Sequence, residues 1–147
     1  MSPTLLWEVR CARGERELAA VLALRREVFC AEQGVPEREE SDGHDDEALH
    51  LVALLDGELL GTCRVLMVGP TAQFSRLAVS APVRRRGIAT ALLDAAEVHS
   101  RRAAARQLVL HAQTYARGLY DRAGYLPRGR IFVEAGIEHV AMEKQLA

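Results

Sequence analysis

The chain has 147 residues, of which 49% are hydrophobic and 27% are charged, and its formal net charge is −1. This balance predicts one soluble globular domain spanning residues 1–147. It excludes a whole-molecule charge that would attract nucleic acid or a membrane surface, and no apolar run approaches the ~18 residues of a membrane-spanning helix.

The first half of the chain predicts a strand, a long helix and a strand hairpin. The strand covers residues 5–12, and the helix covers 15–33, where apolar residues recur at helical spacing until Gly34 and Pro36. Residues 36–47 form a strongly acidic loop. Residues 48–68 contain two apolar runs on either side of Asp56-Gly57, which is a strong signal for a β-hairpin.

The second half predicts a strand at residues 73–80, a helix at 86–105, a strand at 106–112 and a short helix at 114–124, capped by Gly124. Two final strands flank Glu134-Ala135-Gly136. Strands and helices in this order predict an α/β fold, in which a mixed sheet carries helices on both faces.

The stretch LAVSAPVRRRGIATALL, at residues 77–93, combines a strand end, three arginines, a glycine and a helix start. The first N–H groups of a helix have no partners within the helix, and the helix dipole places partial positive charge there. Gly87 would let a ligand approach the backbone, and Arg84, Arg85 and Arg86 add positive charge. Together they predict an anion site suited to a pyrophosphate, although a solvated basic turn is the simpler alternative. The stretch matches neither the Walker loop nor the dinucleotide-binding glycine pattern.

The spacing Arg84-x-x-Gly87-x-Ala89, directly after the strand RLAV, resembles the acetyl-coenzyme A signature of the GNAT superfamily of N-acetyltransferases. Nearly the whole chain takes part in the resemblance. The segments LRREVFCAEQGVPEREESDGHDDEALHLVAL and LHAQTYARGLYDRAGY look specifically like the ElaA-like branch. The resemblance implies a single GNAT-type domain with a mixed, mostly antiparallel sheet of about seven strands flanked by helices.

The same resemblance implies how acetyl-coenzyme A would bind as co-substrate, without a metal. Backbone N–H groups at residues 85–90 would hold the pyrophosphate, and backbone groups of Leu77 and Val79 would pair with the pantetheine arm. Gln113 stands where many family members carry asparagine. The implied cofactor-binding residues are Leu77, Ala78, Val79, Arg84, Arg85, Arg86, Gly87, Ile88, Ala89, Thr90, Gln113 and Tyr120.

Tyr120 is the implied general acid, which would protonate the departing coenzyme A thiolate. A phenol has an ordinary pKa of about 10, and a thiolate is basic enough to accept its proton. The alternative is that Tyr120 is a half-buried residue that packs beneath the sheet.

A general base is also needed, because an amine is mostly protonated at neutral pH and an imidazole suits that role. His111, at the end of a predicted strand, and then His50, in the middle of another, are the first candidates. Glu134 is a further one, and His139 lies in the last strand. For each histidine an ordinary structural role is the alternative.

The acidic segment at 36–47 is open to three interpretations: a solvated loop, a surface that favours a cationic amine, or a metal site, for which its spacing is poor. Cys11, Cys30 and Cys63 are odd in number and widely spaced, so we expect reduced thiols, and the N-terminus shows no signal peptide. We therefore expect a cytoplasmic protein. No base accompanies Cys63 in the sequence, which favours direct transfer over an acyl-cysteine intermediate.

These observations lead to an acyl-coenzyme A-dependent enzyme that transfers an acetyl group to a primary amine of a small molecule or peptide. A non-catalytic protein that binds coenzyme A for regulation is the alternative. A nucleic-acid partner is disfavoured by the balanced charge, and a homodimer is possible.

Overall fold

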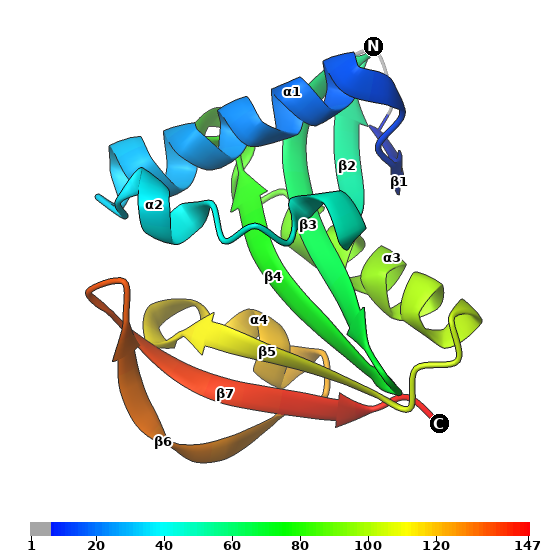
Figure 1. The fold of residues 1–147 in the computed structure, drawn as a ribbon, viewed down its shortest axis with the longest axis vertical. Helices are drawn as coiled ribbons and strands as arrows, with labels where there is room; N and C mark the ends of the chain where they lie inside the picture. The colour runs from blue at the N-terminus through cyan, green and yellow to red at the C-terminus, as the bar shows by residue number, and fades with distance from the viewer. Residues whose placement is uncertain (1–6) are drawn as a thin grey trace, which may run out of the picture.

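The structure, a computed structural model, describes residues 7–147. Its elements follow the predicted order (Figure 1). The first two residues of the strand predicted at 5–12 lie outside the described residues. The strands and α-helices are β1 (Trp7–Cys11), α1 (Gly14–Arg25), α2 (Glu37–Glu40), β2 (Leu49–Leu55), β3 (Glu58–Val68), β4 (Thr71–Val79), α3 (Ile88–Arg102), β5 (Gln107–Gln113), α4 (Gly118–Arg122), β6 (Leu126–Glu134) and β7 (Ile137–Gln145).

Three helical segments differ from the sequence prediction. The long first helix changes winding, since α1 continues as a π-helix at Arg26–Glu32, with a wide-turn bond from Gln33 N–H to the Val28 carbonyl (3.2 Å). The acidic loop contains α2, which starts because Pro36 has a φ of −60° and its carbonyl accepts from the N–H groups of Glu39 and Glu40. The helix predicted at 114–124 divides into a 3₁₀ turn and α4.

The sheet has seven strands in the order β1-β2-β3-β4-β5-β7-β6. Among the described strands, β4 and β5 pair in parallel and every other neighbouring pair is antiparallel. The predicted mixed, mostly antiparallel sheet is therefore confirmed. The parallel pair lies in the middle of the sheet, and α3 makes the crossover between its two strands.

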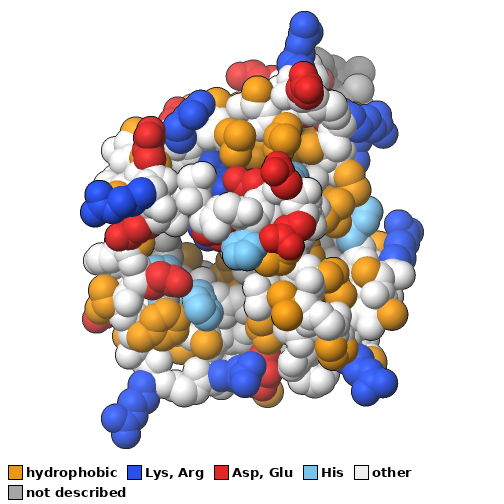
Figure 2. All heavy atoms as spheres, viewed as in Figure 1, with side chains coloured by type: hydrophobic (Ala, Val, Ile, Leu, Met, Phe, Trp, Pro, Cys, Tyr) orange, Lys and Arg blue, Asp and Glu red, His pale blue; other side chains and the backbone are white. Residues whose placement is uncertain are grey.

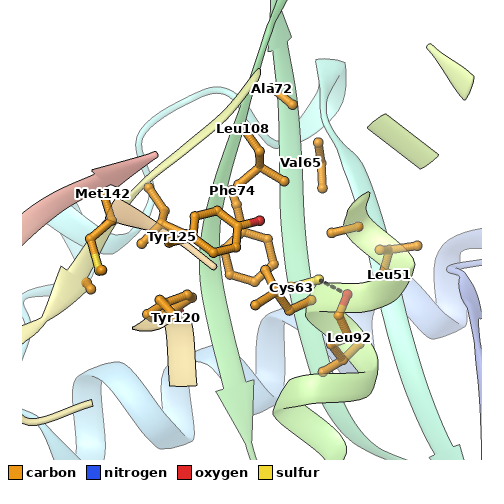
Figure 3. Close-up of a cluster of buried hydrophobic side chains, with 14 of the residues drawn as sticks. Leu51, Cys63, Val65, Ala72, Phe74, Leu92, Leu108, Tyr120, Tyr125 and Met142 are labelled. Carbon is orange, nitrogen blue, oxygen red and sulfur yellow. Dashed lines mark hydrogen bonds between the residues drawn. The ribbon is translucent and has the colours of Figure 1, made fainter. Parts of the chain in front are cut away.

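Helices cover both faces of the sheet, as predicted (Figure 1). Alternate residues of β2 show the division: Val52 and Leu54 cluster with Val21 of α1, whereas Leu51 and Ala53 belong to the larger core beneath α3 and α4. Figure 3 shows part of that larger core, where side chains from β2, β3, β4, β5 and β7 meet Leu92 of α3 and Tyr120 of α4.

A glycine on β3 sets how closely α3 can approach the sheet. A methyl group added at Gly61 would lie 2.9 Å from the Ile88 side chain and 3.2 Å from that of Leu92. Real side-chain contacts are essentially never as short as the first of these distances, so the first turns of α3 pack directly against the backbone of β3. This contact fixes the N-terminus of α3 beside the end of β4.

Candidate active site

The two parallel strands separate halfway along their length, which opens the sheet. Their pairing runs from Thr71 opposite Gln107 to Phe74 opposite Leu110, yet β4 extends to residue 79 and β5 to residue 113. A bulge in β4 lies just beyond Phe74. Thr62 of β3 pairs with Ala78 but Arg64 pairs with Ser75, so two β4 residues lie opposite one residue of β3. Such a bulge bends its strand, and here it accompanies the divergence of β4 from β5.

A cleft of about 1520 Å³ occupies the gap between the separated strands. It is lined by the π-helix, α2, the ends of β4 and β5, the start of α3, α4 and the turn between β6 and β7. Figure 2 shows the molecular surface hollowed below α2, with histidine side chains at the margin. Among the predicted site residues, those that line the cleft are Leu77, Val79, Arg84, Arg85, Gly87, Ile88, Ala89, Thr90, His111, Gln113 and Tyr120.

Backbone groups of β4 face the opening. The N–H of Ser80 donates to the Leu60 carbonyl on β3 (2.8 Å). Successive residues of a strand direct their hydrogen-bonding groups to opposite sides, so the N–H and C=O of Val79 are directed away from β3, and Leu77 belongs to the bulge, where it has no paired residue on β3. Beyond Phe74 no β5 residue pairs with this edge, so an extended ligand could lie along it as another strand, but the Val79 carbonyl already accepts a hydrogen bond from Arg84 (2.8 Å).

The N-terminus of α3 forms the other end of the cleft. Gly87 is its N-cap, with a φ of 82°, and Arg85 also lies in the left-handed region, with a φ of 65°. The N–H of Ala91 is the first to bond within the helix, to the Gly87 carbonyl (3.0 Å), so those of Ile88, Ala89 and Thr90 have no partner within the helix. A methyl group at Gly87 would have no neighbour within 4 Å. The space above this turn is therefore open, and the N–H groups beside it are of the kind from which an anion accepts hydrogen bonds.

The three arginines of the motif have different surroundings. The guanidinium of Arg84 binds Glu32 at the end of the π-helix, with N–O distances of 2.8 and 2.9 Å, and donates to the Val79 carbonyl (2.8 Å). Arg85 lines the cleft, while Arg86 is exposed and does not.

Two other predicted cofactor residues have side chains occupied elsewhere. Ala78 is buried against Leu24 and Val28, so its side chain faces α1 rather than the cleft. The side-chain amides of Gln113 and Gln33 exchange two hydrogen bonds (3.0 and 3.3 Å), and Gln33 also donates to the Tyr115 hydroxyl (3.1 Å). This pair links the end of β5 to the end of the π-helix.

Tyr120 lies at the bottom of the cleft on α4. Its ring packs edge-on against Phe74 (6.2 Å between centroids) and Tyr125 (6.0 Å), and it is 6% exposed. Burial, with a smaller contribution from nearby Cys63, raises the pKa of the Tyr120 phenol above its ordinary value. The hydroxyl therefore remains protonated throughout the physiological pH range, as a proton donor must.

His111 and His139 line the cleft, whereas His50 lies on β2, outside the cleft lining. His111 lines the cleft with Glu134 and His139, and Nδ1 of His111 lies 3.2 Å from a Glu134 carboxylate oxygen. His50 does not line the cleft: it is 8% exposed on β2, and its Nε2 lies 2.9 Å from the Asp45 carbonyl. Geometry thus leaves His111 as the histidine of the two that can reach a ligand between the strands.

The acidic segment is held down by buried arginines, so the solvated-loop interpretation is wrong for its central carboxylates. Arg25, 1% exposed, pairs with Glu40 and with Asp45 (2.8 Å). Arg64, 4% exposed, pairs with Asp42 (2.7 Å) and with Asp45 (3.1 Å). Arg25 thus connects the end of α2 to the end of α1, and Arg64 connects the residues that follow α2 to β3, so that α2 lies at one wall of the cleft. Within residues 7–147, no three His, Cys, Asp or Glu side chains are arranged to hold a metal ion.

Two of the three thiols, those of Cys30 and Cys63, have a raised pKa. Burial raises the pKa of the Cys63 thiol well above its ordinary value, and its sulfur lies 3.9 Å from the Leu92 carbonyl (Figure 3). Burial also raises the pKa of the Cys30 thiol, with further contributions from Glu40 and Glu37. Cys11, Cys30 and Cys63 are all free of disulfides. No helix in the described part of the chain combines the length and the apolar character that crossing a membrane requires.

Comparison with known proteins identifies the family. The profile of the Acetyltransferase (GNAT) domain matches residues 12–146. The chain belongs to this family. It is 33% identical over 135 residues to the uncharacterized N-acetyltransferase YjcF of Bacillus subtilis (strain 168), covering 90% of this chain and 96% of YjcF. This GNAT protein is an acyl-coenzyme A-dependent N-acyltransferase, and its fold class is the one that the sequence predicted.

Two further similarities support the family and the branch. The crystal structure of an acyl-CoA N-acyltransferase from Pseudomonas aeruginosa superimposes with a TM-score of 0.83 at 30% identity, covering 96% of this chain and 99% of the other. Protein ElaA of Escherichia coli (strain K12) is 26% identical over 136 residues, or 88% of each chain, and its crystal structure superimposes with a TM-score of 0.81. The resemblance to ElaA is therefore confirmed.

Sequence reasoning missed two features of the site. Glu32 and Gln33, at the end of the π-helix, contact both sides of the cleft, through Arg84 and Gln113. No local pattern distinguishes them from other polar residues of a helix end. The close packing at Gly61 was also missed, although a glycine inside an apolar strand is a general signal for a close approach of another element.

Proposed function

We propose that this acyltransferase transfers the acetyl group of acetyl-coenzyme A to a primary amine by direct attack in a ternary complex. The observation that carries the proposal is the cleft between the separated ends of β4 and β5, which has the N-terminus of α3 at one end and both Tyr120 and His111 in its lining. One passage through the sheet would let the thioester enter from one side and the amine from the other.

Acetyl-coenzyme A would bind mainly through backbone groups. The pyrophosphate would accept hydrogen bonds from the N–H groups of Arg85 through Thr90, where the helix dipole adds favourable charge. The pantetheine arm would lie along Leu77 and Val79, where the Val79 N–H would be its donor because the Val79 carbonyl is bonded to Arg84. The side-chain amide of Gln113 would bind the pantetheine arm once its hydrogen bonds to Gln33 are broken. Arg84, bound to Glu32, would hold the loop in place rather than meet phosphate.

Two proton transfers would accompany the reaction, one to His111 and one from Tyr120. The amine nitrogen forms a bond to the thioester carbon, and the excess proton on nitrogen passes to Nε2 of His111. The carbon–sulfur bond then breaks, and the sulfur takes a proton from the Tyr120 hydroxyl, which is later restored from solvent. The reactants are the neutral amine and the thioester, and the products are an amide and free coenzyme A; the proton that His111 returns to solvent balances the one that Tyr120 takes up. Backbone N–H groups of β4 would stabilise the oxyanion, and alignment of the two substrates supplies much of the rate.

Direct transfer is supported by the state of the thiols. A nucleophilic cysteine needs a lowered pKa and access to substrate, whereas burial raises the pKa of Cys63 and its side chain is 1% exposed. An acyl-cysteine intermediate would require Cys63 to become exposed and the pKa of its thiol to be lowered.

The acceptor can be identified by following free thiol release from acetyl-coenzyme A with a panel of polyamines, amino sugars, amino acids and lysine peptides. We expect at least one primary amine to accelerate thiol release over the amine-free rate, with formation of the corresponding amide by mass spectrometry. If all amines leave the rate unchanged while acetyl-coenzyme A binds tightly, the protein would instead bind coenzyme A without transferring its acyl group.

A further inference from the structure

The turn between β6 and β7 brings a carboxylate over the end of β5. Ala135 and Gly136 both have positive φ (51° and 76°), which suits a tight two-residue hairpin turn. The turn pairs Glu134 with Ile137 and Phe132 with His139, and His111 pairs with Ala141. Because residues opposite one another in antiparallel strands share a face, the side chains of Phe132, Glu134, His139 and His111 all lie on the cleft face of the sheet.

Glu134 is shared between two imidazole rings. Its carboxylate oxygens lie 3.2 and 3.4 Å from Nδ1 of His111, and one of them lies 3.9 Å from Nε2 of His139. A carboxylate accepts a hydrogen bond but cannot donate one, so Nδ1 of His111 carries a proton. In the neutral ring this leaves the lone pair on Nε2 of His111.

His139 is held by different contacts. Its Nδ1 lies 2.7 Å from the Ile137 carbonyl oxygen, which makes Nδ1 the donor, and its side chain is 9% exposed. The side chain of His111 is 54% exposed. His111 can therefore exchange a proton with solvent after each turnover, whereas His139 is nearly closed off from water.

An aromatic side chain packs against both rings. Phe132 packs edge-on against His111, with 4.9 Å between ring centroids and 78° between planes, and stacks on His139 at 5.9 Å and 21°. Packing against Phe132 thus accompanies the hydrogen bond that directs Nδ1 of His111 toward Glu134.

We propose that Glu134 is the positioning residue of the reaction: it holds His111 in the tautomer that presents Nε2 to the incoming amine, and it stabilises the imidazolium once His111 has taken the amine proton. This inference rests on the proposed function. It assigns His111, rather than His139, as the group that receives the proton. A carboxylate that orients an imidazole and stabilises its protonated form increases the strength of the base.

The other charged groups around His111 are already paired or lie across the cleft. On β7, Glu143 faces the same side and pairs with Arg128 of β6 (3.3 Å). On β4, Arg76 binds the Glu40 carbonyl (2.9 Å) and Asp42 (3.2 Å). From α2, Glu39 lines the same cleft. Glu134 is thus the carboxylate in direct contact with His111, and its removal should change the titration of that ring most.

The first test does not depend on turnover. The variants are Glu134→Gln and Glu138→Gln, the control lying on the opposite face of the same hairpin. NMR titration of the imidazole resonances should move the His111 midpoint at least about 0.5 pH unit lower in Glu134→Gln, because an attractive negative charge is lost. In Glu138→Gln it should stay unchanged. An unchanged His111 midpoint in Glu134→Gln would overturn the proposal.

The second test uses the amine found in the acceptor panel. In Glu134→Gln the acid limb of kcat/KM for the amine should shift to lower pH with the NMR midpoint, and kcat should fall about three- to tenfold, within the range of general-base effects. KM for acetyl-coenzyme A should not change. Adding Glu134→Gln to His111→Ala should cost nothing further, because the two residues act as one unit.

The outcomes separate this inference from the function on which it rests. Equal additional loss from Glu134→Gln with and without His111 would overturn the positioning role while leaving acyl transfer intact. A loss in His139→Gln as large as that in His111→Ala would assign the base to His139 instead. If no amine accelerates thiol release, the proposed function fails, and the NMR titration still decides whether Glu134 controls His111.

Discussion

Arg84 and Glu32 form a bidentate ion pair at the mouth of the cleft, with Nη1–Oε2 and Nη2–Oε1 distances of 2.9 and 2.8 Å. Arg84 belongs to the loop before α3, and Glu32 ends the π-helix, so the pair connects the two sides of the opening. The first arginine of the motif therefore has a carboxylate partner before any phosphate arrives.

This pairing predicts a small role for Arg84 in cofactor affinity. Both side chains are more than a third exposed, and exposed ion pairs contribute little free energy. Arg84→Gln should weaken acetyl-coenzyme A binding less than about threefold, below ~0.7 kcal/mol. Calorimetry at two salt concentrations checks this. A tenfold loss that diminishes in high salt would mean that Arg84 contacts a phosphate directly.

Gly87→Glu should weaken acetyl-coenzyme A binding at least about tenfold, or ~1.4 kcal/mol. The substitution places a side chain and a negative charge in the open space at the start of α3. Gly57→Glu is the matched control, since Gly57 has nearly the same φ (84°, against 82°) and equally open surroundings but lies in the β2–β3 turn. Calorimetry on both folded variants separates backbone strain, which they share, from the effect on the binding site. Equal acetyl-coenzyme A affinities of the two variants would show that the pyrophosphate does not bind at this turn.

Tyr120→Phe should lower kcat about ten- to a hundredfold, the low end of general-acid effects, because a thiolate already leaves readily. Folding and cofactor affinity should hardly change, since the ring contacts remain. Tyr125→Phe is the comparison: it removes a buried hydrogen bond to Glu97 (2.9 Å), so it should reduce the free energy of unfolding and leave the rate unchanged. Single-turnover rates decide, because slow product release can mask a chemical effect. An unaltered rate in Tyr120→Phe would make Tyr120 a packing residue.

Replacement of all three cysteines should leave acyl transfer measurable. Cys63→Ala removes a fully buried side chain and should cost some stability, whereas Cys11→Ser and Cys30→Ser affect partly exposed positions. Activity and thermal unfolding of the triple variant check the prediction. Loss of turnover in one folded single variant, together with an acyl-cysteine trapped on the parent protein, would establish a two-step route.

Acid should destabilise the protein through the ion pairs of Asp42 and Asp45 with Arg25 and Arg64. Hydrogen bonds from Arg64 hold the pKa of Asp42 well below its ordinary value. Burial opposes ionisation of Asp45, but Arg25 and Arg64 lower its pKa overall. In the unfolded chain an aspartate titrates near pH 4. The stabilisation is therefore complete above that pH and is lost as the pH falls toward the lower pKa values of the folded state.

Urea unfolding between pH 7 and pH 3 measures this dependence. Asp42→Asn should be less stable than the parent protein at pH 7 and should lose less stability on acidification, because one of the linked carboxyls is gone. Parallel pH profiles for the two proteins would show that Asp42 contributes nothing to the acid sensitivity.

The sequence was sufficient for the order of elements because the decisive signals are local. Asp56-Gly57 predicted the β2–β3 turn, and Gly87 after the arginines predicted the start of α3; each depends on the conformational preferences of a few neighbouring residues. The change from α- to π-winding at Arg26 was not predicted, since it alters the hydrogen-bonding pattern without changing the apolar spacing by which a helix is recognised.

The sequence by itself determined the order of strands and helices, because this follows from turn signals and from hydrophobic periodicity, and its motifs were specific enough for the resemblance to the family that the comparisons confirmed. Only the tertiary structure decided which polar side chains meet. It set Arg84 against Glu32, Gln113 against Gln33 and Glu134 against His111, pairs separated by 52, 80 and 23 residues. It also placed His50 away from the cleft and turned the acidic segment into a partner for buried arginines. Such pairs depend on how strands separate and how helices pack against them, and no local preference in the chain encodes the distance between two side chains so far apart in sequence.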